Sequence, residues 1–180
     1  MGPADDDPSW AEALASPEHE YWITGGQEEL KSLSDLNIFV LIPRSAMPPG
    51  TCPLCGKLIC KQKHNDSGKV MCYKVHYVAK GYAQCWGIDY DKTTAPTVRL
   101  KSFRSILHIG ATLNQDIQQF NIKTTFLHGI LPPDKTIYME QPNSFEAPDK
   151  SNWVMCLMKS IYGMKQASHI WNQTFHNTVT

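Results

Sequence analysis

Two strand-like runs with a cluster of turn-forming residues between them constrain this fold more than any other feature. Leu58–Gln62 and Val70–Val78 both have the residue content of strands, and His64–Gly68 contains His, Asn, Asp, Ser and Gly. Asn, Asp, Ser and Gly favour tight turns because they tolerate unusual backbone angles or hydrogen-bond to nearby backbone groups. The sequence therefore predicts an antiparallel β-hairpin from Leu58 to Val78.

A second stretch, Ile117–Gly129, has the pattern of a strand in its first half and of a turn in its second half. Its first half alternates apolar and polar residues, as a short strand does, and Lys123–Gly129 then leaves that strand through small residues into a turn. Turns at strand ends often carry catalytic groups because a rigid element positions them. We take Ile117–Gly129 as the stretch around which the rest of the chain is arranged.

Helical periodicity marks three further segments. Pro8–Leu36 has apolar residues at helical spacing, but Gly25-Gly26 lies inside it and predicts either a break or a weakened helix. Leu100–Leu113 predicts an amphipathic helix, and we expect its Leu, Ile and Phe side chains in the core. A last helix is predicted from Met164 onward.

Three short runs suggest further strands. Ile38–Ile42 is apolar and ends at Pro43, and Ile137–Glu140 and Trp153–Lys159 flank a polar loop. Helices and hairpin-like strands in this arrangement indicate an α+β fold.

Charge and composition narrow the classes of function. Lys plus Arg and Asp plus Glu each number 17, whereas tight nucleic-acid binding needs clustered Lys and Arg. No run approaches the roughly 20 apolar residues that span a bilayer, so no membrane partner is expected. The acidic start lacks the order of a secretion signal. We therefore expect residues 1–7 to form a disordered acidic terminus and the protein to be intracellular, in the cytoplasm or the nucleus.

The six cysteines raise the question of a metal site. Cys52-x2-Cys55 is followed by Cys60, His64 and Cys72, and a Cys-x2-Cys pair followed by further Cys and His can bind zinc tetrahedrally. The later spacings match no zinc pattern, and in a reducing compartment the cysteines would stay as thiols. The two hypotheses for these cysteines are therefore that they bind zinc and that they remain free thiols.

Three motifs together closely resemble the reverse transcriptase of copia-type retrotransposons. In the family's order they are Tyr73–Gly81 (Tyr-Lys-Val-His-Tyr-Val-Ala-Lys-Gly), Ile117–Gly129 (Ile-Gln-Gln-Phe-Asn-Ile-Lys-Thr-Thr-Phe-Leu-His-Gly) and Ser160–Trp171 (Ser-Ile-Tyr-Gly-Met-Lys-Gln-Ala-Ser-His-Ile-Trp). The resemblance runs from about Pro8 to Thr180, and its wording suggests the branch found in fungal genomes. It implies a partial right-hand polymerase with an incomplete palm sheet. The fingers would be residues 37–98 and the front of the palm residues 99–180.

The resemblance also implies roles for single residues. Asn121 stands where the family has a metal-binding aspartate, so it marks a degenerate catalytic position, and Phe126 would exclude the ribose 2′-hydroxyl. The residues that would contact the nucleotide are Lys74, His76, Lys80, Ile122, Lys123, Thr124, Thr125, Phe126 and Gln166. No residue of this chain is predicted to be a metal ligand.

The family's reaction uses Mg²⁺ held by carboxylates, with nucleotides and an RNA or DNA primer-template as partners. Asn121 is a neutral amide, and the family's later Asp-Asp pair is absent. We therefore predict that this chain binds no cofactor and is catalytically inactive.

Several residues stand where copia-like proteins have arginine: Cys52, Cys55, His76, Cys156 and others. Arginine to cysteine or histidine is what C-to-T or G-to-A changes in a silenced repeat produce. We therefore expect weak or absent nucleic-acid binding. The alternatives are a zinc-stabilised nucleic-acid or protein interaction module retained after loss of catalysis, and a decayed reading frame without a function.

Overall fold

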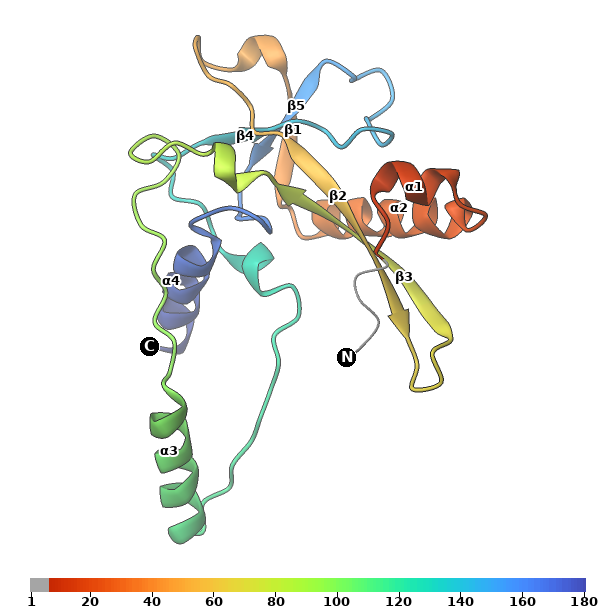
Figure 1. The fold of residues 1–180 in the computed structure, drawn as a ribbon. Helices are drawn as coiled ribbons and strands as arrows, with labels where there is room; N and C mark the ends of the chain where they lie inside the picture. Colours follow the sequence, from red (N-terminus) through yellow and green to blue (C-terminus); the bar gives the residue numbers. More distant parts are fainter. Residues whose placement is uncertain (1–6) are drawn as a thin grey trace.

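The computed structural model describes residues 7–180, in which four α-helices accompany two small antiparallel sheets (Figure 1). The helices are α1 (Trp10–Ala15), α2 (His19–Asp35), α3 (Leu100–Thr112) and α4 (Ala167–Val179). The strands are β1 (Phe39–Pro43), β2 (Gly56–His64), β3 (Val70–Ala79), β4 (Ile137–Met139) and β5 (Trp153–Leu157). The α+β class is as predicted, and the predicted disordered terminus lies outside the described residues except for Asp7.

The predicted hairpin is present as β2 and β3. They pair antiparallel from Gly56 opposite Ala79 onward, and the register shifts near the turn. The turn is organised by Asn65, whose Oδ1 accepts hydrogen bonds from the backbone N–H groups of Ser67 over 3.1 Å and Lys69 over 2.8 Å. The side-chain chemistry that predicted the turn is therefore the chemistry that closes it.

A second sheet contains β1, β5 and β4, with β5 in the centre and antiparallel to both neighbours. Leu157 of β5 lies between Phe39 of β1 and Ile137 of β4. The three predicted strands are thus confirmed. Their order in the sheet is a long-range pairing that the local pattern did not contain.

The N-terminal helical segment breaks at residues 16–18, and the alternative of a break at Gly25-Gly26 is wrong. α2 runs through both glycines, which are buried. A Cβ on Gly25 would lie 3.0 Å from the carbonyl oxygen of Tyr73, and one on Gly26 would overlap the ring of Phe145. Close packing against the hairpin and the loop after β4 therefore outweighs the low helix propensity of glycine.

α3 forms where it was expected, but the prediction that its apolar side chains lie in the core is wrong. None of its residues is buried, and Leu100, Phe103, Ile106 and Ile109 are 60%, 48%, 64% and 55% exposed. Figure 1 shows α3 projecting away from both sheets between extended segments. The amphipathic pattern shows that a helix has a face to bury, but not that the described residues cover it.

The strand predicted in the first half of Ile117–Gly129 is also wrong. Residues 115–122 have no regular secondary structure, and Ile117 and Phe120 are 54% and 74% exposed. Among residues 7–180, no strand pairs with this segment, so alternation alone does not make a strand here. The predicted turn is present, as a 3₁₀ helix from Thr125 to His128.

The main core joins the three-stranded sheet to the end of β3 and the start of α4. It includes Leu33, Ile38, Tyr77, Leu127, Met139, Met155, Leu157, Ile161, Ala167 and Ile170. The last helix is confirmed, although it begins at Ala167 rather than Met164. Among residues 7–180, no helix combines the length and the apolar content that crossing a bilayer requires.

Candidate functional site

The three motifs singled out in the sequence meet at the loop Ser160–Gly163. The Ser160 hydroxyl donates to the carbonyl oxygen of Phe126, and the Ser160 N–H donates to the carbonyl oxygen of Gly129 over 2.7 Å. From the hairpin, the N–H of Ala79 donates to the carbonyl oxygen of Tyr162 over 2.8 Å. This loop therefore fastens the turn of the central stretch to the end of β3.

The ring of Tyr162 joins two of the predicted nucleotide contacts. The ring centroids of His76 and Phe126 each lie 5.7 Å from that of Tyr162, and Phe126 meets it edge-on. The carboxylate of Glu29 on α2 lies 3.3 Å from His76 Nδ1. Burial raises the pKa of Tyr162, and the charge on Glu29 adds to this rise, so the phenol keeps its proton at neutral pH.

The turn after Asn121 is strained at one residue. Thr124 has a φ of 52°, in the left-handed region that β-branched residues rarely adopt. Its hydroxyl donates to the carbonyl oxygen of Lys123 over 2.7 Å, and the Thr125 hydroxyl donates to that of Ile122 over 2.7 Å. Side-chain hydrogen bonds thus help to hold a backbone shape of the kind that recurs at functional sites.

Gln166 is nearly buried, and it lines a small pocket together with residues that include Asp89 and His169. It is 5% exposed, its Oε1 accepts from Gln84 Nε2 over 3.0 Å, and its Nε2 donates to the carbonyl oxygen of Asp89 over 3.1 Å. Each end of the amide keeps a second hydrogen-bonding site, so a further contact does not require either bond to break. Gln84 was missed by the sequence analysis, since a single glutamine in a loop gives no signal before its buried partner is known.

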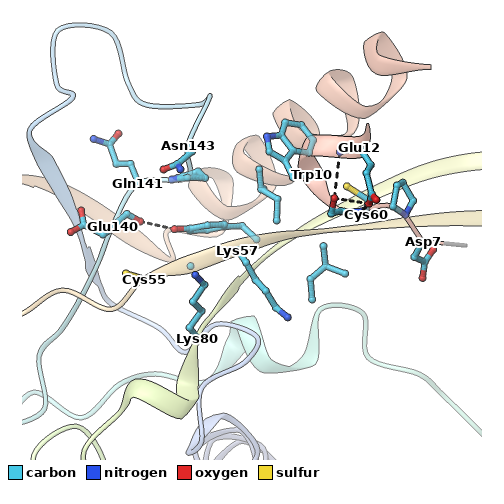
Figure 2. Close-up of a pocket in the computed structure, with 17 residues that line it drawn as sticks. Asp7, Trp10, Glu12, Cys55, Lys57, Cys60, Lys80, Glu140, Gln141 and Asn143 are labelled. Carbon is cyan, nitrogen blue, oxygen red and sulfur yellow. Dashed lines mark hydrogen bonds between the residues drawn. The ribbon is translucent and has the colours of Figure 1, made fainter. Parts of the chain in front are cut away.

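The two predicted fingers lysines lie apart from this junction. Lys74 is exposed on β3, directly opposite Lys61 on β2. Lys80 follows β3, where its N–H donates to the carbonyl oxygen of Cys55 over 2.9 Å, and its side chain lines a pocket beside the hairpin (Figure 2). The structure therefore brings His76 and Phe126 together through Tyr162, but leaves Lys74, Lys80 and Gln166 outside that group.

The residue types around Asn121 do not fit a bound Mg²⁺ ion. Asn121 is exposed, its side chain is a neutral amide, and the sequence has no Asp or Glu between Asp116 and Asp134. Mg²⁺ is bound through charged oxygen ligands, usually carboxylates and phosphates. This turn offers none from its own side chains.

The cysteines give the zinc hypothesis no geometric support. Cys52, Cys55 and Cys72 are exposed, whereas Cys60 is buried under the helices. Within residues 7–180, no group of three or more His, Cys, Asp or Glu side chains is arranged to hold a metal ion. A zinc site in this region stays a hypothesis.

Comparison with known proteins identifies the family. Residues 39–180 match the family described as reverse transcriptase (RNA-dependent DNA polymerase). The chain is 39% identical over 167 residues to the retrovirus-related Pol polyprotein from transposon TNT 1-94 of Nicotiana tabacum, which covers 93% of this chain and 12% of that protein. It is 32% identical over 166 residues to the corresponding polyprotein from transposon RE1 of Arabidopsis thaliana, covering 92% of this chain and 11% of that protein.

No solved structure matches the chain. Both of these relatives are plant proteins, so the assignment to a fungal branch stays a prediction. The chain spans a small part of each, 12% and 11% of their lengths. Since the family match takes in most of the chain, the protein belongs to the reverse transcriptase (RNA-dependent DNA polymerase) family and resembles one segment of a copia-type Pol polyprotein.

Proposed function

We propose that this chain is the fingers and the front of the palm of a right-hand polymerase, a remnant of an enzyme for RNA-directed DNA synthesis that is inactive as it stands. The fingers would be residues 37–98, which contain the β2–β3 hairpin, and the palm residues 99–180. The nucleotide would lie near the turn of residues 122–126 and the end of β3, with Phe126 under the sugar.

One observation carries this proposal. Three motifs far apart in the sequence meet at residues 160–163, where Ser160 bonds to the Phe126 carbonyl and Tyr162 packs against both His76 and Phe126. A nucleotide site assembled from fingers and palm needs such a junction. Gln166, Lys74 and Lys80 lie outside this junction. One nucleotide could therefore touch all the predicted residues only if parts of the chain moved on binding.

The loss of activity rests on Asn121. Two-metal polymerase chemistry needs carboxylates to hold the ions, and an amide keeps the shape of aspartate without its charge. Removing a single preorganised electrostatic group typically lowers a rate by about 10²- to 10³-fold, and a metal ligand should lie at or beyond the upper end. The chain alone should therefore extend no primer with Mg²⁺ or Mn²⁺, and Asn121→Asp alone should not restore extension because the later Asp-Asp pair is also absent.

The test is a pair of chimeras that differ at one side chain. Residues 1–180 replace the corresponding segment of a working copia-type polymerase, with and without Asn121→Asp, and single-nucleotide incorporation is measured beside the unmodified polymerase. We expect the Asn121→Asp chimera to be faster by at least about 10²-fold. Equal rates in two chimeras that incorporate nucleotide would show that Asn121 is not at the metal position.

Binding to nucleic acid should be weak. The chain has a formal net charge of +0, and His76 stands where the family has arginine, whose planar guanidinium is a permanently charged donor. Fluorescence anisotropy with a labelled primer-template should give low affinity and a shallow dependence on salt. Nanomolar affinity at physiological salt would contradict the proposal and favour a retained interaction module.

A further inference from the structure

An open pocket of about 800 Å³ lies between the start of α1, the first half of β2 and the loop after β4 (Figure 2). Pockets for small organic ligands usually measure about 300–1,000 Å³, so this one is large enough. Of the residues with a predicted nucleotide contact, Lys80 is the one that lines it. The pocket is therefore a different surface from the junction at residues 160–163.

The acidic side chains around the pocket are already engaged. Asp7 lies 3.8 Å from the ammonium group of Lys61. Glu12 is held in the capping box at the start of α1. Glu140 contacts the guanidinium of Arg44 with both carboxylate oxygens. Asp7 and Glu140 are therefore each paired with a cation, whereas Glu12 is held by hydrogen bonds from Ser9.

The two lysines that line the pocket differ in this respect. In the part of the chain that the structure describes, neither Lys57 nor Lys80 forms an ion pair. Both stand near the start of β2, since the N–H of Lys80 bonds to the carbonyl oxygen of Cys55. In the view of Figure 2 they lie across the pocket from Gln141 and Asn143. Among residues 7–180, these two ammonium groups therefore have no carboxylate partner and can contact an anion in the pocket.

Two neutral polar side chains around the pocket already form hydrogen bonds with the backbone, and several other lining residues are apolar. Both ends of the Gln141 amide bond to backbone groups of the loop after β4. The Tyr77 hydroxyl donates to the carbonyl oxygen of Glu140 over 2.8 Å. Trp10, Leu58 and Pro142 provide an apolar wall. A ligand that matches the two lysines and the apolar wall has a compact negative charge and a flat apolar body.

We propose that this pocket binds a small phosphate monoester with an aromatic or similarly flat body. A phosphate dianion has enough oxygens to accept hydrogen bonds from both Lys57 and Lys80, and such charge-assisted bonds are roughly twice as strong as neutral ones. The body lies against Trp10 and Leu58, where its apolar surface leaves water. A carboxylate on the same body carries one negative charge and binds more weakly.

The probes are phenyl phosphate, inorganic phosphate and benzoate. Each is titrated by calorimetry into the full chain carrying Phe103→Glu and Ile109→Lys, which limit association through the exposed α3 and lie outside the pocket. We expect saturable binding of one phenyl phosphate per chain, tighter than that of either other probe. The same titration should change the fluorescence of Trp10, and Trp10→Phe should remove that change.

Single substitutions locate the site. Lys57→Gln and Lys80→Gln should each weaken phenyl phosphate binding about tenfold, since each removes one hydrogen bond from a charged donor. Lys63→Gln is the matched control, because Lys63 is an exposed lysine of the same hairpin that does not line the pocket. An equal loss in the control would mean diffuse attraction to the hairpin and would overturn the proposal. Non-saturable binding, or equal affinity for inorganic phosphate, would overturn it too.

Discussion

Gly81 and Gly163 touch through their backbones. A Cβ on Gly81 would overlap the carbonyl oxygen of Gly163, and one on Gly163 would overlap that of Ala79. Gly163 also has a φ of +88°, which side chains rarely adopt. The end of β3 and the loop before α4 are therefore closer than any other residue would allow, and this contact holds the junction of the three motifs together.

Gly81→Ala should destabilise the protein by about 3 kcal/mol or more, because the clash is with backbone and not with a flexible side chain. The measurement is urea unfolding in the background with Phe103→Glu and Ile109→Lys. Gly68→Asn is the control, since Gly68 has open space around it and asparagine tolerates its φ of +76°. Equal stability of the two variants would show that the Gly81 contact is not tight.

Thr124 should tolerate glycine better than its neighbour does. Thr124→Gly relieves a left-handed β-branched residue, which costs about 1–2 kcal/mol, and this offsets the entropy that glycine loses on folding. Both substitutions remove a hydroxyl hydrogen bond, to the carbonyl of Lys123 or of Ile122, but Thr125→Gly relieves no left-handed strain. We expect Thr125→Gly to be less stable than Thr124→Gly by at least about 1 kcal/mol in urea unfolding. The reverse order would mean that Thr124 is not strained.

The exposed face of α3 should drive association. Leu100, Phe103, Ile106 and Ile109 are all largely exposed, and unpartnered apolar surface of this kind favours aggregation or chaperone binding. Phe103→Glu with Ile109→Lys should raise the soluble, monomeric fraction severalfold in size-exclusion chromatography with light scattering. The control is Ser102→Glu with Ser105→Lys, which adds the same charges and keeps the apolar residues. A monodisperse monomer without any substitution would contradict this prediction.

Cys60 should be the least reactive of the thiols. Burial raises its pKa to about 11, whereas Cys52, Cys55, Cys72 and Cys85 are exposed. Alkylation at pH 8 followed by peptide mass spectrometry should therefore modify these four well before Cys60. Modification of Cys60 at the same rate would mean that the hairpin opens on the timescale of the reaction.

The same shift predicts a loss of stability in alkaline solution. A thiol whose folded pKa is raised stabilises the fold fully below its unfolded pKa of about 8.5, and this contribution falls as pH rises toward 11. Cys60→Val removes the ionisable group. The free energy of unfolding of this variant should therefore fall less between pH 8 and pH 11 than that of the parent chain. Parallel pH profiles would refute the assignment.

The elements that the sequence predicted are those whose determinants are local. Asn65 and Gly68 define the hairpin turn, and the apolar runs define the strands. The predictions that failed depended on distant partners that a local pattern does not show. Gly25-Gly26 lie within a helix because β3 and Phe145 pack against them, and Ile117–Phe120 is not a strand because no strand in the described part of the chain pairs with it.

The site shows the same division. Motif resemblance selected His76 and Phe126, but gave no role to Tyr162 or Ser160, which bring them together. It assigned Gln166 to the nucleotide, which stays a prediction, but it did not show that Gln84 and Asp89 bind its amide. Residue types can be matched along a sequence, but the contacts that satisfy a buried polar group appear only in three dimensions.

Because β5 is the central strand, the three-stranded sheet cannot form until β5 has been synthesised. During synthesis at roughly 5–20 residues per second, β1 emerges several seconds before Leu157, the residue that pairs with Phe39, has been made. The β2–β3 hairpin and α2 can form meanwhile, because their contacts span shorter loops and cost less chain entropy to close. Until β5 has been made, β1 therefore lacks the strand that it pairs with. A chaperone that acts on the nascent chain would bind the apolar side chains of β1 during this interval.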